Sequence, residues 1–182
     1  IDLDTCPVLV PALKDAPAIA RAVARPLTRL GKPMDVQLTA TTAGIDCDIR
    51  GIGRIEPPLR LILSETAARL DLARLAIHGD VVVERRAPLI PMGRALVNAP
   101  PGGFLQATEQ GEETLALLVE AAIGKAKKVV DLFSGAGPFA LRLAERRAVT
   151  AYDSDRPAIE ALLKAARATP GLKAVSAEAR DL

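Results

Sequence analysis

The sequence predicts an α/β fold in which a doubly wound parallel sheet follows a smaller α/β unit. In the C-terminal part, short apolar segments alternate with helix-forming segments, which is typical of parallel strands joined by right-handed crossovers. The first of these apolar segments, 129–133, runs directly into a glycine-containing turn. Prolines and glycines at 98–103 interrupt all periodicity, so we place the boundary there and expect units at 1–100 and 101–182.

The elements of the N-terminal unit follow from periodicity and from turn residues. Its segments predict a helix that is broken near a proline and ended by a glycine, a β-hairpin, a second helix after two prolines, and two short strands. In chain order these are 13–30, 36–41 with 45–50, 59–70, and 72–77 with 81–84. Cys47 is expected to be a buried thiol within its strand. His78, the only histidine, falls in a turn signal without a Ser or Cys partner, which favours a surface or capping role.

The C-terminal unit begins with a helix whose apolar side chains recur every three or four residues and which ends at Gly124. Its expected buried face is Leu115, Leu118, Val119, Ala122 and Ile123. The segments that follow predict strand 129–133, helix 138–146, strand 148–152, helix 156–168 and strand 172–177. Such a sheet would leave one strand edge free, and a free edge favours self-association.

The turn after strand 129–133 is typical of a nucleotide site. Gly135 and Gly137 allow the backbone to approach a ligand closely, and a proline then opens the next helix. A Gly-x-Gly-x-x-Ala turn can seat the pyrophosphate of NAD. Asp131, however, places a carboxylate just before the glycines, where it would repel a pyrophosphate and attract the amino group of S-adenosylmethionine. We therefore favour S-adenosylmethionine over NAD.

Two further acidic residues follow the next two strands. Asp153 lies about 20 residues beyond the glycines, where a carboxylate can accept both ribose hydroxyls. Glu178 ends the third predicted strand and could receive the adenine amino group. The alternative is that Asp153 and Asp155 are helix caps and that Glu178 lies in solvent.

Two motifs together carry a family resemblance. The Phe-Leu-Gln stretch at 104–106 and the Asp-Leu-Phe-Ser-Gly-Ala-Gly stretch at 131–137 resemble those of RNA (uracil-5-)-methyltransferases. The resemblance implies a Rossmann-like class I methyltransferase sheet, S-adenosylmethionine as cofactor, ribosomal or transfer RNA as partner and 5-methyluridine as product. It also implies the residues that contact the cofactor, which are Gln106, Asp131, Phe133, Ser134, Gly135, Gly137, Asp153 and Glu178. Ser134 and Pro138 stand where the family usually has cysteine and asparagine.

The resemblance further implies groups that lie outside these residues. The family forms a covalent adduct between a cysteine and uracil, with a glutamate as base, and both groups belong after the third strand. We therefore expect a fragment of a longer enzyme that is inactive alone. Cys6 stands where the family has one ligand of an iron–sulfur cluster, whose other ligands are expected upstream.

Composition restricts the remaining classes only weakly. The formal net charge is +2, aromatic residues make up 2% of the chain, and no apolar run approaches the length of a membrane helix, so we expect a cytoplasmic protein. Two other hypotheses stay open from the sequence: an NAD-dependent oxidoreductase module, and a non-catalytic RNA-binding or assembly module.

Overall fold

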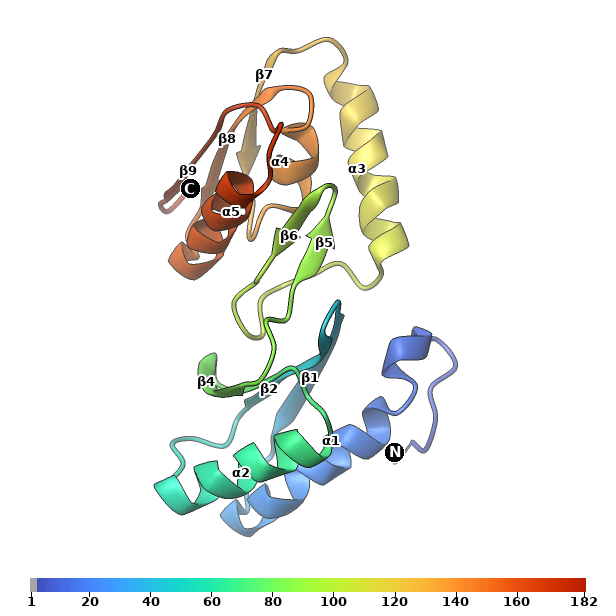
Figure 1. The fold of residues 1–182 in the computed structure, drawn as a ribbon, viewed down its shortest axis with the longest axis vertical. Helices are drawn as coiled ribbons and strands as arrows, with labels where there is room; N and C mark the ends of the chain where they lie inside the picture. Colours follow the sequence, from blue (N-terminus) through green and yellow to red (C-terminus); the bar gives the residue numbers. More distant parts are fainter. Residues whose placement is uncertain (1–2) are drawn as a thin grey trace. The chain divides into compact units, whose positions relative to one another are not determined.

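A computed structural model describes residues 3–182 and divides the chain after Pro88 into two compact units (Figure 1). Each unit has its own hydrophobic core. The predicted division within 98–103 therefore differs from the structure, where it falls earlier. The residues between form a small hairpin, β5 (Ile90–Met92) with β6 (Ala95–Val97), that the sequence analysis did not predict. This hairpin contacts α4 (Pro138–Leu143) and α5 (Arg156–Ala168) of the second unit, and Met92, Ala95 and Val97 are buried in that unit's core.

The first unit is a four-stranded sheet with helices on one face. Its elements are η1 (Pro11–Leu13), α1 (Ala16–Ala24), η2 (Arg25–Leu30), β1 (Asp35–Thr41), β2 (Gly44–Arg50), α2 (Pro57–Arg69), β3 (Arg74–Ile77) and β4 (Asp80–Glu84). The sheet order is β1-β2-β3-β4, and only the β2–β3 pair is parallel. The predicted helix at 13–30 is thus α1 followed by a 3₁₀ turn, which Gly31 ends in the left-handed conformation.

Alternation along β2 and β3 sends one set of side chains into the core and the other set to the opposite face. Cys47 and Ile49 of β2 and Leu75 of β3 are fully buried against helical residues such as Leu27 and Leu63. The predicted burial of the Cys47 thiol is confirmed. Burial raises its pKa to about 12, with nearby Asp46 and Asp48 adding to the shift, so the thiol stays protonated.

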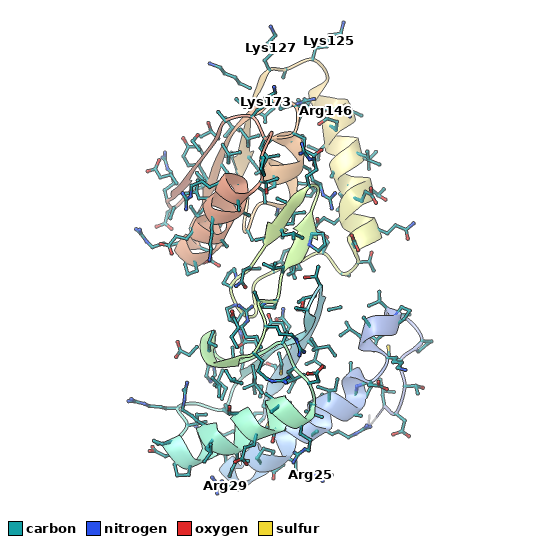
Figure 2. The ribbon with its side chains drawn as sticks, in the orientation of Figure 1. Arg25, Arg29, Lys125, Lys127, Arg146 and Lys173 are labelled. Carbon is teal, nitrogen blue, oxygen red and sulfur yellow. The ribbon has the colours of Figure 1, made fainter. Side chains whose placement is uncertain are left out.

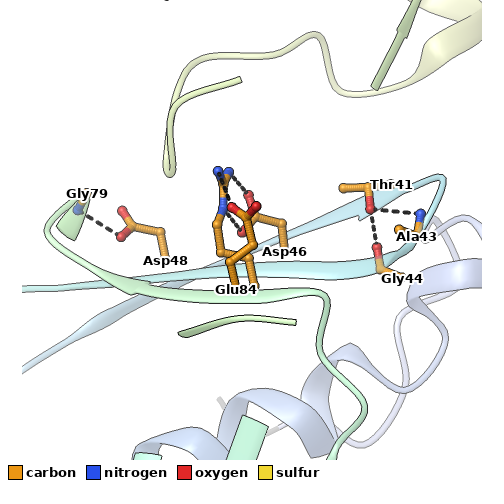
Figure 3. A network of polar contacts seen from close by, with 8 residues as sticks. Thr41, Ala43, Gly44, Asp46, Asp48, Gly79 and Glu84 are labelled. Carbon is orange, nitrogen blue, oxygen red and sulfur yellow. Dashed lines mark hydrogen bonds and ion pairs between the residues drawn. The ribbon is translucent and has the colours of Figure 1, made fainter. Parts of the chain in front are cut away.

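The opposite face of this sheet holds buried charges (Figure 3). Arg74 of β3 donates two hydrogen bonds to Asp46 of β2, at 2.9 and 2.6 Å, and the two residues are 4% and 7% exposed. Asp48, 2% exposed, accepts from the Gly79 N–H at 3.0 Å and from Arg50 at 2.7 Å. Each buried carboxylate is therefore compensated by cations or by amide donors.

His78 lies in the two-residue turn between β3 and β4. It is exposed and has a φ of 52°, and its Nε2 accepts a hydrogen bond from the Gly53 N–H at 3.2 Å. The predicted surface or capping role is confirmed, since the ring caps a neighbouring loop.

The second unit carries a parallel three-stranded sheet of order β7-β8-β9 after the hairpin. Its further elements are α3 (Glu109–Ile123), β7 (Lys128–Leu132), α4 (Pro138–Leu143), β8 (Ala148–Asp153), α5 (Arg156–Ala168) and β9 (Val175–Ala179). The α/β class and the alternation of strands and helices are confirmed. The third strand starts later than the predicted 172–177, because Val175 is the residue that pairs with Val149 of β8.

Within residues 3–182, helices cover one face of the sheet of the second unit, and the other face is exposed. Val149 and Ala151 of β8 are buried against α4 and α5, with Leu141 and Leu162 in the same core. On the opposite face of β7, Val130 and Leu132 are 63% and 54% exposed. β7 is also an edge strand, which pairs only with β8 within residues 3–182.

The apolar face predicted for α3 is only partly correct. Val119 and Ile123 pack against the core, but Leu115 and Leu118 are 40% and 62% exposed. The helix is held instead by ion pairs that periodicity did not indicate, Glu112 with Arg142 and Glu120 with Arg147. No helix in the described part of the chain is long and apolar enough to cross a membrane.

Candidate functional site

The candidate site lies at the carboxyl ends of β7, β8 and β9. Ser134 follows β7, and its N–H donates to the Tyr152 carbonyl of β8 at 3.0 Å, so the sheet continues into the turn. The chain then reverses, with the Gly137 N–H donating to the Ser134 carbonyl at 2.9 Å, before α4 begins at Pro138. Carboxyl ends of parallel strands are where ligands bind in such sheets.

The two glycines of the turn are required for different reasons. Gly137 has a φ of 93°, and a Cβ there would lie 2.6 Å from the buried Leu162 side chain. Gly135 has a φ of 52°, and a Cβ there would have no neighbour within 4 Å. Gly137 thus permits close packing of the turn on α5, whereas Gly135 leaves open space over the backbone, as a ligand approach requires.

Asp153, at the end of β8, holds this turn. Its Oδ2 accepts from the Gly135 N–H at 2.7 Å, and its Oδ1 accepts from the Asp155 N–H at 2.8 Å. Asp155 in turn caps α5 by accepting from the Ala158 N–H at 3.2 Å. The helix-cap alternative is therefore correct for Asp155. A carboxylate offers about four acceptor positions, so Asp153 keeps capacity for ligand hydroxyls.

Asp131 is the residue of this turn whose electrostatics are most perturbed. Burial raises the pKa of its carboxyl from 3.8 to about 6, a hydrogen bond from the Ala140 backbone opposes this shift, and the nearby charge of Asp153 adds to it. Its Oδ2 is buried and has no hydrogen-bond partner among the described residues. The hydroxyl oxygen of Ser134, a residue that is 4% exposed, is likewise buried and has no hydrogen-bond partner among the described residues. Unsatisfied buried acceptors are costly, and a ligand with amine donors would satisfy them.

The other predicted contact residues lie at the same edge or before it. Phe133 is 73% exposed and has a φ of 59°, a conformation that costs a non-glycine residue about 1–2 kcal/mol and is often found at functional sites. Glu178 is exposed in β9, paired in register with Tyr152 of β8. Gln106 is half-buried in the loop before α3.

One residue that the sequence analysis missed lies at this edge. Arg180 follows β9, donates its N–H to the Asp153 carbonyl at 2.8 Å, and places its guanidinium 5.3 Å from the centre of the Tyr152 ring. Its position two residues beyond Glu178, directly after β9, was the available signal, since side chains two apart along an extended chain share a face.

The cysteines do not form a metal site by themselves. Cys6 is half-buried before η1 and Cys47 is buried in β2, and both are free thiols. Within residues 3–182, no three His, Cys, Asp or Glu side chains are grouped so as to hold a metal ion. A cubane iron–sulfur cluster takes four thiolates, so these residues do not fit one without further ligands.

Comparison with curated proteins finds relatives over the whole chain. It is 43% identical over 182 residues to an uncharacterized RNA methyltransferase of Brucella suis biovar 1, covering all of this chain and 44% of that protein. It is 31% identical over 207 residues to the 23S rRNA (uracil(1939)-C(5))-methyltransferase RlmD of Chromohalobacter salexigens, covering 41% of that protein. The chain thus spans less than half the length of these relatives. No protein-family model matches it.

Comparison with solved structures supports the fold. The chain aligns over 98% of its length with the Pyrococcus abyssi tRNA (uracil-54, C5)-methyltransferase in complex with S-adenosyl-L-homocysteine, with a TM-score of 0.71 at 16% identity, covering 48% of that chain. The chain therefore shares its α/β fold with about half of that solved protein. Together the comparisons confirm the resemblance inferred from the motifs: over its whole length, the chain is homologous to RNA methyltransferases.

Proposed function

We propose that this chain is the S-adenosylmethionine-binding portion of an RNA (uracil-5-)-methyltransferase. The observation that carries the cofactor assignment is the buried, unpartnered Oδ2 of Asp131 directly behind the glycine turn. A dinucleotide would bring a pyrophosphate, which a carboxylate repels, whereas S-adenosylmethionine brings an ammonium, which the carboxylate attracts. The RNA assignment rests on the relatives, one of which is named for uracil C5 methylation.

In this proposal, different residues of the candidate site contact different parts of the cofactor. Asp131 and Ser134 receive the amino end, Asp153 receives the ribose hydroxyls, and Glu178 receives the adenine amino group. Gly135 lets the backbone approach the ligand, and Gln106 and Phe133 bound it. When bound, the cofactor supplies the methyl group, while the protein excludes water and holds the ligand in one orientation.

The chemistry on uracil requires further groups. The proposed reaction needs a cysteine thiolate and a general base near the cofactor's methyl group. The second unit has no cysteine, and Cys47 is a buried, protonated thiol of the first unit. We therefore propose that the nucleophile and the base come from outside these 182 residues.

We further propose that Cys6 supplies one ligand of an iron–sulfur cluster in the cytoplasmic full-length protein. It is half-buried and free, as a ligand completed by other cysteines would be. Substituting Cys6→Ser in a full-length protein should lower its iron content, whereas Cys47→Ser should not. Equal iron content in all three proteins would rule out this role.

The free edge of β7 supports a further proposal, that this chain self-associates through that edge. In the part of the chain that the structure describes, β7 is paired on one side only, and Val130 and Leu132 are exposed beside the free edge. Sedimentation over a dilution series should show a concentration-dependent dimer. The substitution Val130→Lys should then abolish it, because a charge on an edge strand opposes pairing.

The decisive test of the proposed cofactor is calorimetric titration with S-adenosylhomocysteine and, separately, with NAD. Glu178→Ala is the informative variant, because Glu178 is exposed and its loss should not disturb the fold. A hydrogen bond to a charged group is worth about 1.5–3 kcal/mol, so the affinity should fall at least about tenfold. Glu65→Ala, an exposed glutamate of the first unit, is the matched control and should bind like wild type. Binding of NAD alone would contradict the proposal.

A further inference from the structure

The amino ends of the three parallel strands bring basic residues from three separate segments together. The Ala148 N–H donates to the Lys127 carbonyl at 3.1 Å, and the Lys173 N–H donates to the Ala144 carbonyl at 2.7 Å. These bonds hold the segments before β7, β8 and β9 side by side. We call the exposed basic side chains there the amino-edge cluster, which consists of Lys125, Lys127, Lys128, Arg146 and Lys173. The four that Figure 2 labels lie at the same end of the second unit.

The cluster is exposed and largely uncompensated. All five residues are exposed, and the side chains of the four lysines make no hydrogen bond or ion pair with any residue in 3–182. Among the described residues, the acidic group that forms an ion pair with the cluster is Glu120 of α3, which is 3.4 Å from Arg146 and already paired with Arg147. Glu145, the other nearby carboxylate, accepts a hydrogen bond from the Arg94 N–H.

The concentration of charge here exceeds that of the chain as a whole. The segments 120–128, 144–148 and 172–174 contain six basic and two acidic residues, whereas the whole chain has a net charge of +2. The remainder is therefore net acidic. Because like charges repel, folding brings these lysines together at some electrostatic cost, and a polyanion would remove that cost.

We propose that the amino-edge cluster contacts the phosphate backbone of the RNA substrate. This inference rests on the proposed function, which supplies RNA as the polyanion. Lysines are flexible point charges, and none of the chain's three Phe or its Tyr belongs to the cluster, so phosphates rather than bases would be recognised. The contact should therefore add affinity without sequence preference.

The position of the cluster determines which part of the RNA it would contact. It lies at the amino ends of the parallel strands, whereas the candidate cofactor site lies at their carboxyl ends. The length of a five-residue strand, β7, separates the two. At about 3.3 Å per residue this is roughly 17 Å, more than one nucleotide spans. The cluster would thus contact a flanking segment of the RNA, while the target uracil lies at the other edge.

The test is RNA binding by this chain as a function of salt. The probe is a fluorescein-labelled RNA hairpin with single-stranded flanks, titrated with wild type and with Lys125→Ala/Lys127→Ala. Each lost phosphate contact should lower the slope of log affinity against log salt by about 0.7, so the double variant should lose about 1.4. Arg25→Ala/Arg29→Ala removes the same charge from η2 of the first unit, where both residues are exposed, and is the matched control (Figure 2).

The outcomes separate this inference from the proposed function. A reduced slope for the lysine variant but not for the arginine control supports the cluster, provided that both variants bind S-adenosylhomocysteine as wild type does. Equal slopes in all three proteins, or no binding of RNA by wild type, overturn the cluster and leave the cofactor assignment intact. The inference is also overturned if polyglutamate competes for the cluster as well as unlabelled RNA does, since that result would indicate an acidic protein partner. A failure of the wild-type chain to bind S-adenosylhomocysteine would instead refute the proposed function.

Discussion

At the residue scale, two carboxylates from neighbouring strands divide the candidate site between them. Asp153 accepts one hydrogen bond from the Gly135 N–H and another from the Asp155 N–H, so it stabilises the turn. Asp131 accepts a hydrogen bond from the Ala140 backbone, and its Oδ2 is buried without a hydrogen-bond partner among the described residues. An alanine at Asp153 would therefore disturb the turn itself, whereas a change at Asp131 tests ligand binding more directly.

The raised pKa of Asp131 predicts a pH dependence of stability. The folded protein holds this proton more tightly than the unfolded chain, since its pKa moves from 3.8 to about 6. The stabilisation is fully present below about pH 4 and is lost as the pH rises through about 6. Asp131→Asn should remove this fall, as followed by urea unfolding at a series of pH values. Asp80→Asn, at an exposed position, should keep it, and equal profiles for both variants would contradict the assignment.

The same carboxylate predicts how ligand binding depends on pH. A cationic amino group favours the ionised form of Asp131, so the affinity for S-adenosylhomocysteine should rise between about pH 5 and pH 7, with release of a proton near pH 6. Calorimetry in two buffers of different ionisation enthalpy measures that proton. A pH-independent affinity would show that Asp131 does not contact the ligand.

The two glycines predict opposite balances of stability and binding. Gly137→Ala should destabilise the fold by about 2–5 kcal/mol, because a left-handed φ and a contact of 2.6 Å with Leu162 add together. Gly135→Ala has open space, so it should cost only about 1–2 kcal/mol of unfolding free energy. Its methyl group would instead occupy the ligand's space and weaken binding. Thermal unfolding and ligand titration on both variants check this, and a reversed order would contradict it.

At the element scale, the parallel pair of β2 and β3 buries an ion pair that only strand pairing creates. Asp46 and Arg74 are 28 positions apart and are joined by the register of the two strands. Because Arg74 is 4% exposed, water cannot replace the two hydrogen bonds to Asp46 when that carboxylate is removed. The pair therefore ties the β2–β3 register to the stability of the first unit.

Removing one partner of this pair should be costly. We expect Asp46→Ala to destabilise the first unit by about 3–5 kcal/mol, since the buried Arg74 guanidinium loses the carboxylate to which it donates two hydrogen bonds. Asp71→Ala is the matched control. That carboxylate also meets two arginines, Arg85 and Arg86, but it is exposed, so its loss should have little effect. Urea unfolding of both variants measures the difference, and equal losses would show that burial is not the cause.

At the scale of the whole molecule, the chain consists of two units with separate cores, and the candidate site belongs entirely to the second. Asp46→Ala should therefore leave the affinity for S-adenosylhomocysteine within about twofold of wild type at temperatures where the first unit stays folded. Ligand titration of that variant, beside its unfolding curve, tests the independence of the units. A parallel loss of binding would show that the first unit supports the site.

The sequence by itself determined the elements whose signals are local. Strand 129–133 and helix 156–168 are nearly residue-accurate, because apolar periodicity, the glycine turn and the Asp155 cap are all encoded within a few positions. The candidate site could be predicted for the same reason, since Asp131, the glycines and Asp153 all lie at or near the carboxyl ends of strands that the sequence itself indicates. The burial of Cys47 followed from alternation along one strand.

Only the tertiary structure decided what depends on pairing between distant segments. The start of β9, the docking of the hairpin at 90–97, the exposure of Leu115 and Leu118 on α3, and the bond from Gly135 to Asp153 all join residues that no local pattern connects. The amino-edge cluster arises in the same way, from three short segments that are unremarkable one at a time. The physical reason is that local propensity fixes dihedral angles over a few residues, whereas register, burial and charge proximity are fixed by which strands pair.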